Sequence, residues 1–186
     1  VADDPRHEAE ILLGAALGKP RGWILAHPEE RILDCNATDR YEAYVTRRSH
    51  GEPVAYVLGE KEFWSLPLAV TPDVLIPRPE TESLVVAILD HAKQKGDQPP
   101  FAIADVGTGS GIIAVTAAKH VPCAHVTAVD VSPAALAVSR ENSSRHGVGE
   151  RVEFIESDLF ASVPADRQFD IIASNPPYIE SSDAHL

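Results

Sequence analysis

Two short segments combine residue types that could do chemistry. The first, Asp105–Gly111, reads DVGTGSG and lies between an apolar run and a segment with a helical pattern. Glycines let the backbone turn sharply and approach a ligand, and a helix N-terminus presents free N–H groups. The spacing G-x-G-x-G differs from the G-x-G-x-x-G of dinucleotide-binding folds. This pattern predicts a ligand-binding loop, with a tight strand-to-helix turn as the alternative.

The second segment is Ser174–Tyr178, which reads SNPPY and follows the apolar run FDIIA. Pro176 and Pro177 remove two backbone donors and fix two φ angles, so the corner is rigid. The Asn175 side-chain oxygen and the Pro176 carbonyl can accept the two hydrogens of a planar NH₂ group, and the Tyr178 ring can stack on it. Such acceptors would stabilise positive charge developing on that nitrogen. The alternative is a turn that only ends the strand.

Acidic residues follow the ends of two further predicted strands. Asp130 ends AVD and can accept hydrogen bonds from both hydroxyls of a ribose. Its alternative role is to cap the helix that starts at Pro133, for which Ser132 is better placed. Asp158 could accept from an exocyclic amine while Leu159 packs on a base. Together with the glycine loop, these residues predict a nucleoside site at the carboxyl edge of a parallel sheet.

The elements that position these residues alternate between strands and helices. Apolar runs predict strands at FAIADV, HVTAVDV, RVEFIESD and FDIIAS, and helices at SGIIAVTAAKH and PAALAVSRENSSRHG. Ser132 is the expected cap of the second of these helices, and Pro133 is its first residue. The alternation indicates an α/β fold with a Rossmann-like parallel sheet.

The chain before this sheet is predicted to be mostly helical. Asp3 or Asp4 can cap a helix that begins at Pro5, and Asp39 with Glu42 resembles the capping box of another. EFWSLPLAV and VLIP are expected to pair as a hairpin around the turn sequence TPD, followed by a helix. We therefore expect a small helical domain over 1–58, a β-hairpin linker over 59–79 and a ligand-binding domain over 80–186.

Composition and charge exclude several classes of protein. The 186 residues are 44% apolar and carry a net charge of −12, which argues against a broad grip on DNA or RNA. The two cysteines and eight histidines show no metal-ligand spacing, so no metal site is expected. The acidic N-terminal sequence VADDPRHEAE is unlike a secretory signal, and a cytoplasmic protein with reduced thiols is expected.

The motifs resemble those of class I S-adenosylmethionine-dependent methyltransferases: DVGTGSG is similar to their cofactor loop, Asp130 to their ribose acid, and SDL to their adenine-side segment. NPPY is similar to the motif of enzymes that methylate a planar amino or amide nitrogen. GEPVAYVLGEKEFWSLPLAV followed by VLIPRPETE resembles one branch, the HemK/PrmC family of release factor glutamine methyltransferases. The match runs from Gly51 to Ile179.

This resemblance implies S-adenosyl-L-methionine as cofactor and S-adenosyl-L-homocysteine as product. It implies transfer of the methyl group to the side-chain nitrogen (N5) of the glutamine in the Gly-Gly-Gln motif of class-1 peptide chain release factors. The helical N-terminal domain would help to dock that protein substrate, and no direct nucleic-acid or membrane binding is expected.

The resemblance also implies roles for individual residues. The cofactor is expected against Asp105, Gly107, Thr108, Gly109, Ser110, Gly111, Asp130, Asp158, Leu159, Asn175, Thr81 and Glu82. The substrate is expected against Asn175, Pro176, Pro177, Tyr178 and Arg78, with catalytic roles for Asn175, Pro176 and Tyr178. Arg78, between two prolines, has an alternative role as an anchor of the hairpin to the sheet.

The sequence departs from the family pattern near its end. A complete sheet of this class has further strands, and FDIIAS would otherwise expose an apolar strand edge. Since the chain also contains no methionine and begins with valine, we expect it to be part of a longer enzyme.

Three other functions compete with glutamine methylation. A nucleic-acid amino-methyltransferase acting on N6 of adenine or N4 of cytosine would share NPPY, but the net charge of −12 and LIPRPETE disfavour it. A non-catalytic module of incomplete fold would only bind a partner. An NAD oxidoreductase is disfavoured by the glycine spacing.

Overall fold

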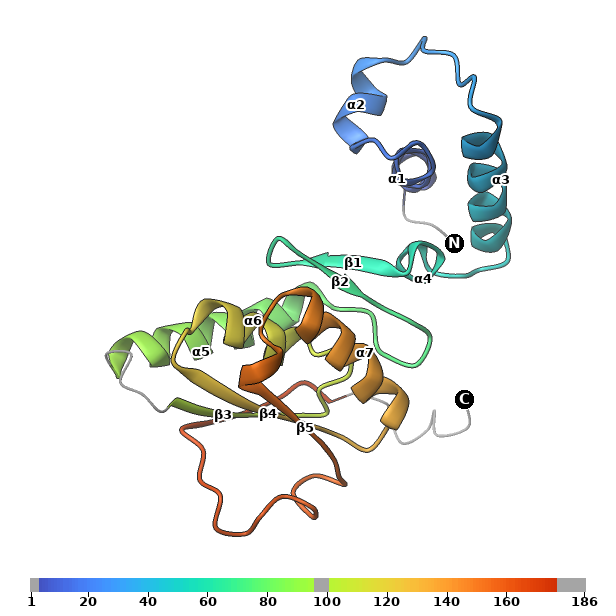
Figure 1. Cartoon of the computed structure of the whole chain (residues 1–186). Helices are drawn as coiled ribbons and strands as arrows, with labels where there is room; N and C mark the ends of the chain where they lie inside the picture. Colours follow the sequence, from blue (N-terminus) through green and yellow to red (C-terminus); the bar gives the residue numbers. More distant parts are fainter. Residues whose placement is uncertain (1–3, 96–100, 177–186) are drawn as a thin grey trace. The chain divides into compact units, whose positions relative to one another are not determined.

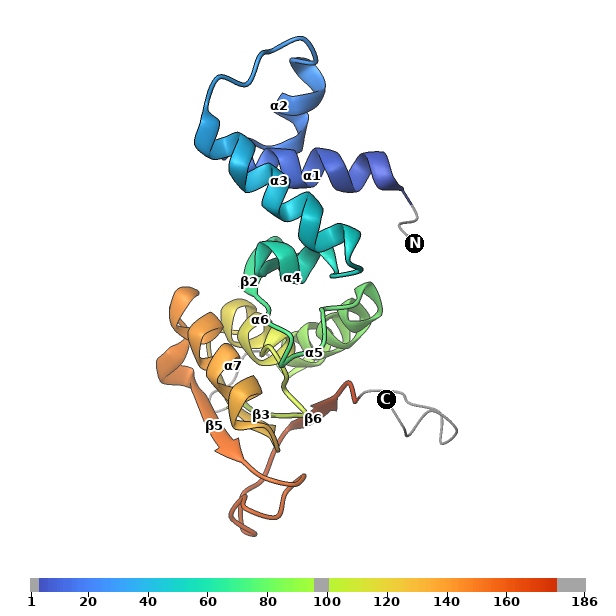
Figure 2. The same cartoon turned by 90° about the vertical axis from the view of Figure 1, so that its right-hand side faces the viewer.

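The computed structural model describes residues 4–95 and 101–176. The chain forms two compact units, Val1–Glu60 and Lys61–Leu186. Figures 1 and 2 show the helices of the first unit and the sheet with its helices in the second. No helix in the described ranges is long and apolar enough to cross a membrane.

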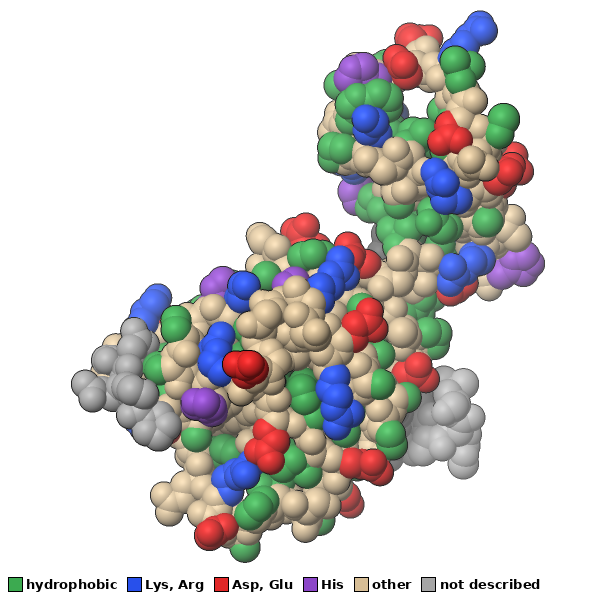
Figure 3. Space-filling model, viewed as in Figure 1, with side chains coloured by type: hydrophobic (Ala, Val, Ile, Leu, Met, Phe, Trp, Pro, Cys, Tyr) green, Lys and Arg blue, Asp and Glu red, His purple; other side chains and the backbone are tan. Residues whose placement is uncertain are grey.

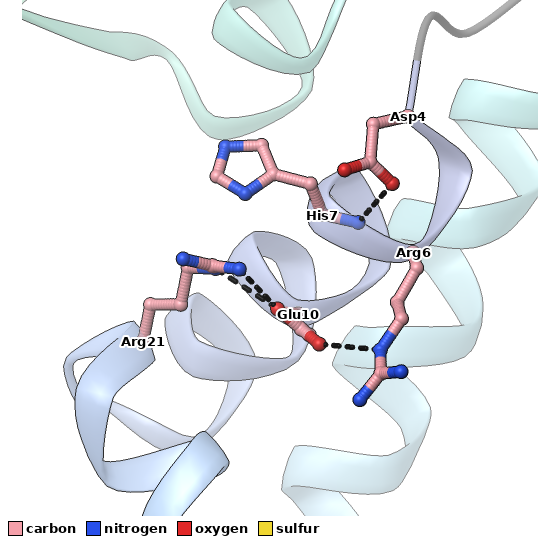
Figure 4. Close-up of polar contacts among 5 residues, drawn as sticks. All are labelled: Asp4, Arg6, His7, Glu10 and Arg21. Atoms are coloured by element: carbon pink, nitrogen blue, oxygen red, sulfur yellow. Dashed lines mark hydrogen bonds and ion pairs between the residues drawn. The ribbon is translucent and has the colours of Figure 1, made fainter.

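The first unit contains α1 (Pro5–Leu17), α2 (Arg21–Ala26), α3 (Cys35–Ser49) and α4 (Val54–Leu58). The Asp4 carboxylate caps α1 by accepting from the His7 backbone N–H at 3.1 Å, as Figure 4 shows. Pro5 is the first helical residue, and Gly18 ends the helix in the left-handed conformation. The predicted start at Pro5 is confirmed, with Asp4 as the cap; Asp3 lies outside the described residues.

An ion-pair cluster joins α1 to α2. The Glu10 carboxylate accepts from Arg6 Nε at 2.9 Å and from Arg21 Nε at 2.9 Å (Figure 4). The hydrogen bond from Arg6, with that from Arg21, lowers the pKa of Glu10 below its ordinary value. The carboxylate therefore remains ionised further into the acidic range, and its ion pairs with Arg6 and Arg21 persist there.

The start of α3 differs from the prediction. The capping box at Asp39 and Glu42 is wrong, because the helix begins at Cys35 and Asp34 is its cap. The Asp34 side chain accepts from the Asn36 backbone N–H at 2.9 Å. The run CNAT has modest helix propensity, but its Ala37 is only 2% exposed. Packing of this residue extends the helix one turn earlier than the local pattern indicates.

The second unit contains a parallel sheet of β3 (Phe101–Val106), β4 (Ala124–Asp130), β5 (Val152–Glu156) and β6 (Ile171–Ser174). The strand order is β5-β4-β3-β6. The predicted α/β fold and its strands are confirmed. All four strands end at one edge, so the segments that follow them can share one site.

Three helices cover one face of this sheet: α5 (Glu82–Gln94), α6 (Ile112–His120) and α7 (Pro133–Arg145) (Figures 1 and 2). The core lies between these helices and the sheet, with Ile103, Val115 and Val126 almost fully buried. Ser132 caps α7 by accepting from Ala135 N–H at 3.2 Å, as predicted. At the β6 edge of the sheet Ile172 is 60% exposed, the apolar edge that the sequence leads one to expect.

The hairpin forms earlier than predicted. It pairs β1 (Glu60–Phe63) with β2 (Leu66–Ala69) through a two-residue turn, Trp64-Ser65, at φ of 50° and 57°. The predicted strand VLIP is wrong, because residues 74–77 have no regular secondary structure. Two positive φ angles suit a tight hairpin turn, but the Asn-Gly or Asp-Gly sequence that usually marks one is missing. The prolines in TPDVLIPRP remove the donors that a second strand would need.

Candidate active site

The glycine loop after β3 has an unusual backbone. Gly107, Gly109 and Gly111 all have positive φ angles, of 72°, 53° and 80°. A Cβ atom built on Gly107 or Gly109 would meet nothing within 4 Å. The first two glycines are therefore explained by their conformation and by open space, into which a ligand can approach the bare backbone.

Gly111 has a different reason to be glycine. A Cβ atom at this position would lie 2.2 Å from Ser139 Oγ and 3.2 Å from Ser139 Cα. The position thus allows α6 to begin against α7. It fixes where the loop ends and where the first N–H groups of α6 point.

Gly111→Ala is expected to lower the free energy of unfolding by about 2–5 kcal/mol, the sum of a left-handed backbone and an overpacked contact. The matched control is Gly147→Ala, which has a φ of 69° but nothing within 4 Å of a built Cβ. It should lose only about 1–2 kcal/mol. Urea unfolding of both variants measures the difference. Equal losses in the free energy of unfolding would show that the contact with Ser139 does not contribute to the effect of Gly111→Ala.

Asp130 holds the glycine loop against the end of β4. Its carboxylate accepts from the Gly109 N–H at 2.9 Å and from the Ser132 N–H at 3.0 Å. The half-buried carboxylate has further acceptor positions beyond these two. Since Ser132 caps α7, Asp130 is free of the capping role and remains suited to a ligand with hydroxyl groups.

Asp105 braces the same loop from inside the protein. The side chain is 1% exposed, and its Oδ2 accepts from Thr108 Oγ1 at 2.6 Å and from Ala114 N–H at 3.1 Å. Oδ1 is buried and has no hydrogen-bond partner among the described residues. Burial raises the pKa of Asp105 from 3.8 to about 6. The loop therefore contains a buried carboxyl group that titrates in the mildly acidic range.

This raised pKa of Asp105 predicts a pH dependence of stability. Between about pH 4 and pH 6 the folded state binds more protons than the unfolded state, so stability falls as pH rises through this window. The difference between 3.8 and about 6 corresponds to about 3 kcal/mol. Asp105→Asn cannot titrate, so its free energy of unfolding relative to wild type should rise by about that amount between pH 4 and pH 7. A pH-independent difference would contradict the burial argument.

A small cleft, partly open to solvent, brings three distant segments together. They are the LIPR segment before α5, the glycine loop and the end of β6. The lining residues are Leu75, Ile76, Pro77, Arg78, Thr81, Gly107, Thr108, Gly109, Ser110, Ile112, Ile113 and Asn175. The predicted ligand loop and Asn175, the first residue of the predicted NH₂-binding corner, thus share one cleft.

At the β6 end of the cleft, Asn175 is held by its neighbours. Ser174 pairs with Val106 across the sheet, and Ser174 Oγ donates to the Val106 carbonyl at 2.8 Å. The Asn175 side-chain nitrogen donates to Thr81 Oγ1 at 2.8 Å. Pro176 is exposed beside it. The other two members of the corner, Pro177 and Tyr178, lie outside the described residues.

Of the remaining predicted residues Arg78, Asp158, Leu159 and Glu82, only Arg78 lines this cleft. Arg78 is exposed, and its side chain makes no hydrogen bond or ion pair to any part of the chain that the structure describes. Asp158 and Leu159 are exposed after β5, and Leu159 has a φ of 50°, a strained value for leucine. Glu82 is exposed at the start of α5 and does not line the cleft.

Asn142 on α7 supports the glycine loop, and the sequence patterns did not predict it. It is fully buried, and its Oδ1 accepts from Ala69 N–H at 2.7 Å. Its Nδ2 donates to the Ala69 carbonyl at 3.0 Å and to the Ser110 carbonyl at 2.8 Å. One side chain thus ties β2, α7 and the glycine loop together. The only signal in the sequence was a polar residue on the apolar face of a predicted helix.

Two family models match the chain. The methyltransferase small domain matches residues 83–186, which includes the glycine loop and Asn175. The PrmC N-terminal domain matches residues 1–59. The second match covers nearly all of the first compact unit, and the first match covers the second unit from residue 83 onward.

Curated relatives match over almost the whole chain. The release factor glutamine methyltransferase of Koribacter versatilis is 44% identical over 180 residues, which are 97% of this chain and 62% of that protein. That of Bordetella pertussis is 46% identical over 182 residues, 98% of this chain and 65% of that protein. The chain therefore spans 62% to 65% of the length of these relatives.

The solved structures include methyltransferases of the same fold. The human methyltransferase 10 domain containing protein aligns with a TM-score of 0.50 and 16% identity, covering 80% of this chain and 65% of that one. This likeness confirms the Rossmann-like methyltransferase fold.

Proposed function

Because the chain belongs to the methyltransferase small domain family and carries a PrmC N-terminal domain, we propose that the protein methylates a glutamine side chain in class-1 peptide chain release factors. The family match confirms the resemblance to the HemK/PrmC family that the motifs predict. The methyl donor is S-adenosylmethionine, and the acceptor is the N5 nitrogen of the glutamine in Gly-Gly-Gln. The observation that carries this proposal is the single cleft shared by the glycine loop and Asn175.

The residues present fit the proposed cofactor. Gly107 and Gly109 leave bare backbone that a side chain would cover, and the Asp130 carboxylate beside them has acceptor capacity for ribose hydroxyls. Asp158 and Leu159 are proposed to contact the adenine. When bound, S-adenosylmethionine supplies a methyl group on a positively charged sulfonium.

The chain's own residues orient and stabilise the acceptor nitrogen. A carboxamide nitrogen is a weak nucleophile because its lone pair is delocalised into the carbonyl group. Asn175 Oδ1 accepts one N–H of the glutamine amide, and the Pro176 carbonyl accepts the other. Two fixed acceptors align the nitrogen for a direct displacement and stabilise the positive charge that it gains. Its proton leaves after the transfer, so the mechanism needs no general base with a shifted pKa.

Several further roles belong to this proposal. Pro177 and Tyr178 complete the substrate corner, with the Tyr178 ring stacking on the amide. Arg78, an unpaired cation at the cleft among the described residues, contacts the protein substrate. Residues 1–58 dock the release factor, 59–79 form the linker and 80–186 bind the cofactor. The reaction takes place in the cytoplasm, where translation terminates.

The charge distribution favours a protein substrate over a nucleic acid. The net charge is −12, and Figure 3 shows Lys and Arg side chains scattered singly among acidic and neutral ones on the displayed face of the second unit. A nucleic-acid methyltransferase would need clustered basic residues to hold phosphates.

The test is methyl transfer from labelled S-adenosylmethionine to three acceptors: a class-1 release factor, its Gly-Gly-Gln variant with alanine in place of glutamine, and duplex DNA. Label is expected only on the first. Label on DNA or on the alanine variant would contradict the proposed substrate. Failure to bind S-adenosylmethionine in calorimetry would instead support a non-catalytic binding module.

A further inference from the structure

We propose that Thr81 is a positioning residue that fixes the orientation of the Asn175 side-chain amide. The two residues are far apart in the chain, yet Asn175 Nδ2 donates to Thr81 Oγ1 at 2.8 Å. Thr81 is 2% exposed and lines the same cleft as Asn175. The inference rests on the proposed function, because it assigns a role to this hydrogen bond in presenting Asn175 to the substrate amide.

The Thr81 hydroxyl does not cap α5, although Thr81 stands at the N-cap position of that helix. Thr81 ends a 3₁₀ turn, Pro79–Thr81, and occupies the N-cap position of α5. A threonine at this position normally accepts from a backbone N–H of the first helical turn. Here its backbone is already helical, with φ −66° and ψ −19°, and the side chain makes no capping bond. The hydroxyl is therefore available to Asn175.

In the structure the hydrogen bond to Thr81 occupies the donor end of the Asn175 amide and leaves its acceptor end open to the substrate. An asparagine side chain has a donor end and an acceptor end, and a half-turn exchanges them. With Nδ2 bound to Thr81, Oδ1 points elsewhere, and no described residue donates to it. An open acceptor is what an incoming NH₂ group needs. If the amide were reversed, the Asn175 NH₂ group would face the substrate NH₂ group. It could then neither accept a hydrogen bond nor stabilise the positive charge on the substrate nitrogen.

The backbone before Asn175 is held in place, so only the side-chain torsion angles of Asn175 remain to be fixed. The preceding backbone is held by the pairing of Ser174 with Val106 and by the hydrogen bond between them at 2.8 Å. Thr81 is itself held by its backbone N–H, which donates to the Arg78 carbonyl at 3.1 Å. Two anchored segments thus meet through one hydrogen bond.

Thr81→Val tests this role because valine has nearly the same shape and no hydroxyl. We expect kcat for glutamine methylation to fall about 10-fold to 100-fold, since the partly buried amide loses its partner and its orientation. The KM for the release factor and the calorimetric Kd for S-adenosylmethionine should stay within about two-fold. Thr81→Ser, which keeps the hydroxyl, should restore most of kcat. Should Thr81→Val fail to fold, Thr81→Ala carries the same test.

A matched control and a readout independent of turnover complete the experiment. Thr116→Val also replaces a fully buried threonine, one whose hydroxyl has no partner among the described residues, and should leave kcat unchanged. The side-chain NH₂ signals of Asn175 in ¹⁵N NMR, assigned with Asn175→Asp, should shift and broaden in Thr81→Val but not in Thr116→Val. The NMR result reports the orientation even where no methylation is measured.

Two outcomes would overturn the inference. Unchanged kcat and unchanged Asn175 signals in Thr81→Val would show that the hydrogen bond does not orient the amide, while wild-type methylation would leave the proposed function intact. An equal loss of cofactor affinity and kcat would make Thr81 a cofactor-pocket residue, the role predicted from the sequence. Failure of the proposed function shows separately, as a wild-type protein that methylates no glutamine.

Discussion

Asn175→Ala is expected to lower kcat by about 100-fold to 1000-fold, the loss typical when one preorganised hydrogen-bonding group is removed from a developing charge. Asn175 lies at the end of β6, in the cleft with the glycine loop, and its Nδ2 is already bound to Thr81. Its Oδ1 is therefore the proposed acceptor for the glutamine NH₂. Because this contact strengthens as the nitrogen becomes cationic, its removal affects the rate more than binding.

Steady-state kinetics and calorimetry on the same protein preparation measure this effect. The Kd for S-adenosylmethionine should change by less than about three-fold, since Asp130 and the glycine loop remain. Asn36→Ala, an exposed asparagine on α3, is the matched control for cofactor binding and should leave the Kd for S-adenosylmethionine at its wild-type value. A variant at Asn175 that keeps most of its kcat would remove this residue from the mechanism.

Asp130→Ala is expected to have the opposite pattern. The Kd for S-adenosylmethionine should rise about 30-fold to 300-fold, because the carboxylate that is proposed to accept from two ribose hydroxyls is lost. In the wild-type protein the Gly109 N–H donates to Asp130 at 2.9 Å. The variant loses this hydrogen bond, so the glycine loop is held less firmly in the conformation that binds the cofactor. At saturating cofactor kcat should fall less than about ten-fold, since Asn175 and Pro176 are untouched.

The matched control for Asp130 is its register neighbour. Glu156 pairs with Asp130 across β4 and β5 and is exposed, so Glu156→Ala removes a carboxylate from the same sheet edge without touching the loop. It should leave the Kd unchanged. If Asn175→Ala and Asp130→Ala weakened cofactor binding equally, the division between a cofactor residue and a substrate residue would be wrong.

The sheet and its helices could be predicted because local signals agree with the final packing. FAIADV and HVTAVDV are apolar runs of strand length, and Ser132-Pro133 marks the start of α7 in both sequence and structure. The start of α3 could not be predicted, because burial of Ala37 outweighs the modest propensity of CNAT. The hairpin turn at Trp64-Ser65 uses residues that rarely mark such turns.

Part of the site could be predicted from the order of the strands alone. The glycine loop and Asp130 follow neighbouring strands, so topology alone brings them to one edge. The contacts of Thr81 with Asn175 and of Asn142 with Ser110 join segments far apart in the chain. No local pattern encodes them, because they depend on how α5 and α7 pack against the sheet. Thr81 was expected to line a cofactor pocket, and its contact with Asn175 emerged only from the fold.

Tandem mass spectrometry of a class-1 release factor, after incubation with the protein and S-adenosylmethionine, tests glutamine methylation directly. We expect one added methyl group, on the side-chain nitrogen of the glutamine in Gly-Gly-Gln, with none after reaction with the Asn175→Ala variant over the same time. A methyl group on any other residue, or an unmodified release factor in the presence of a protein that binds the cofactor, would contradict this expectation.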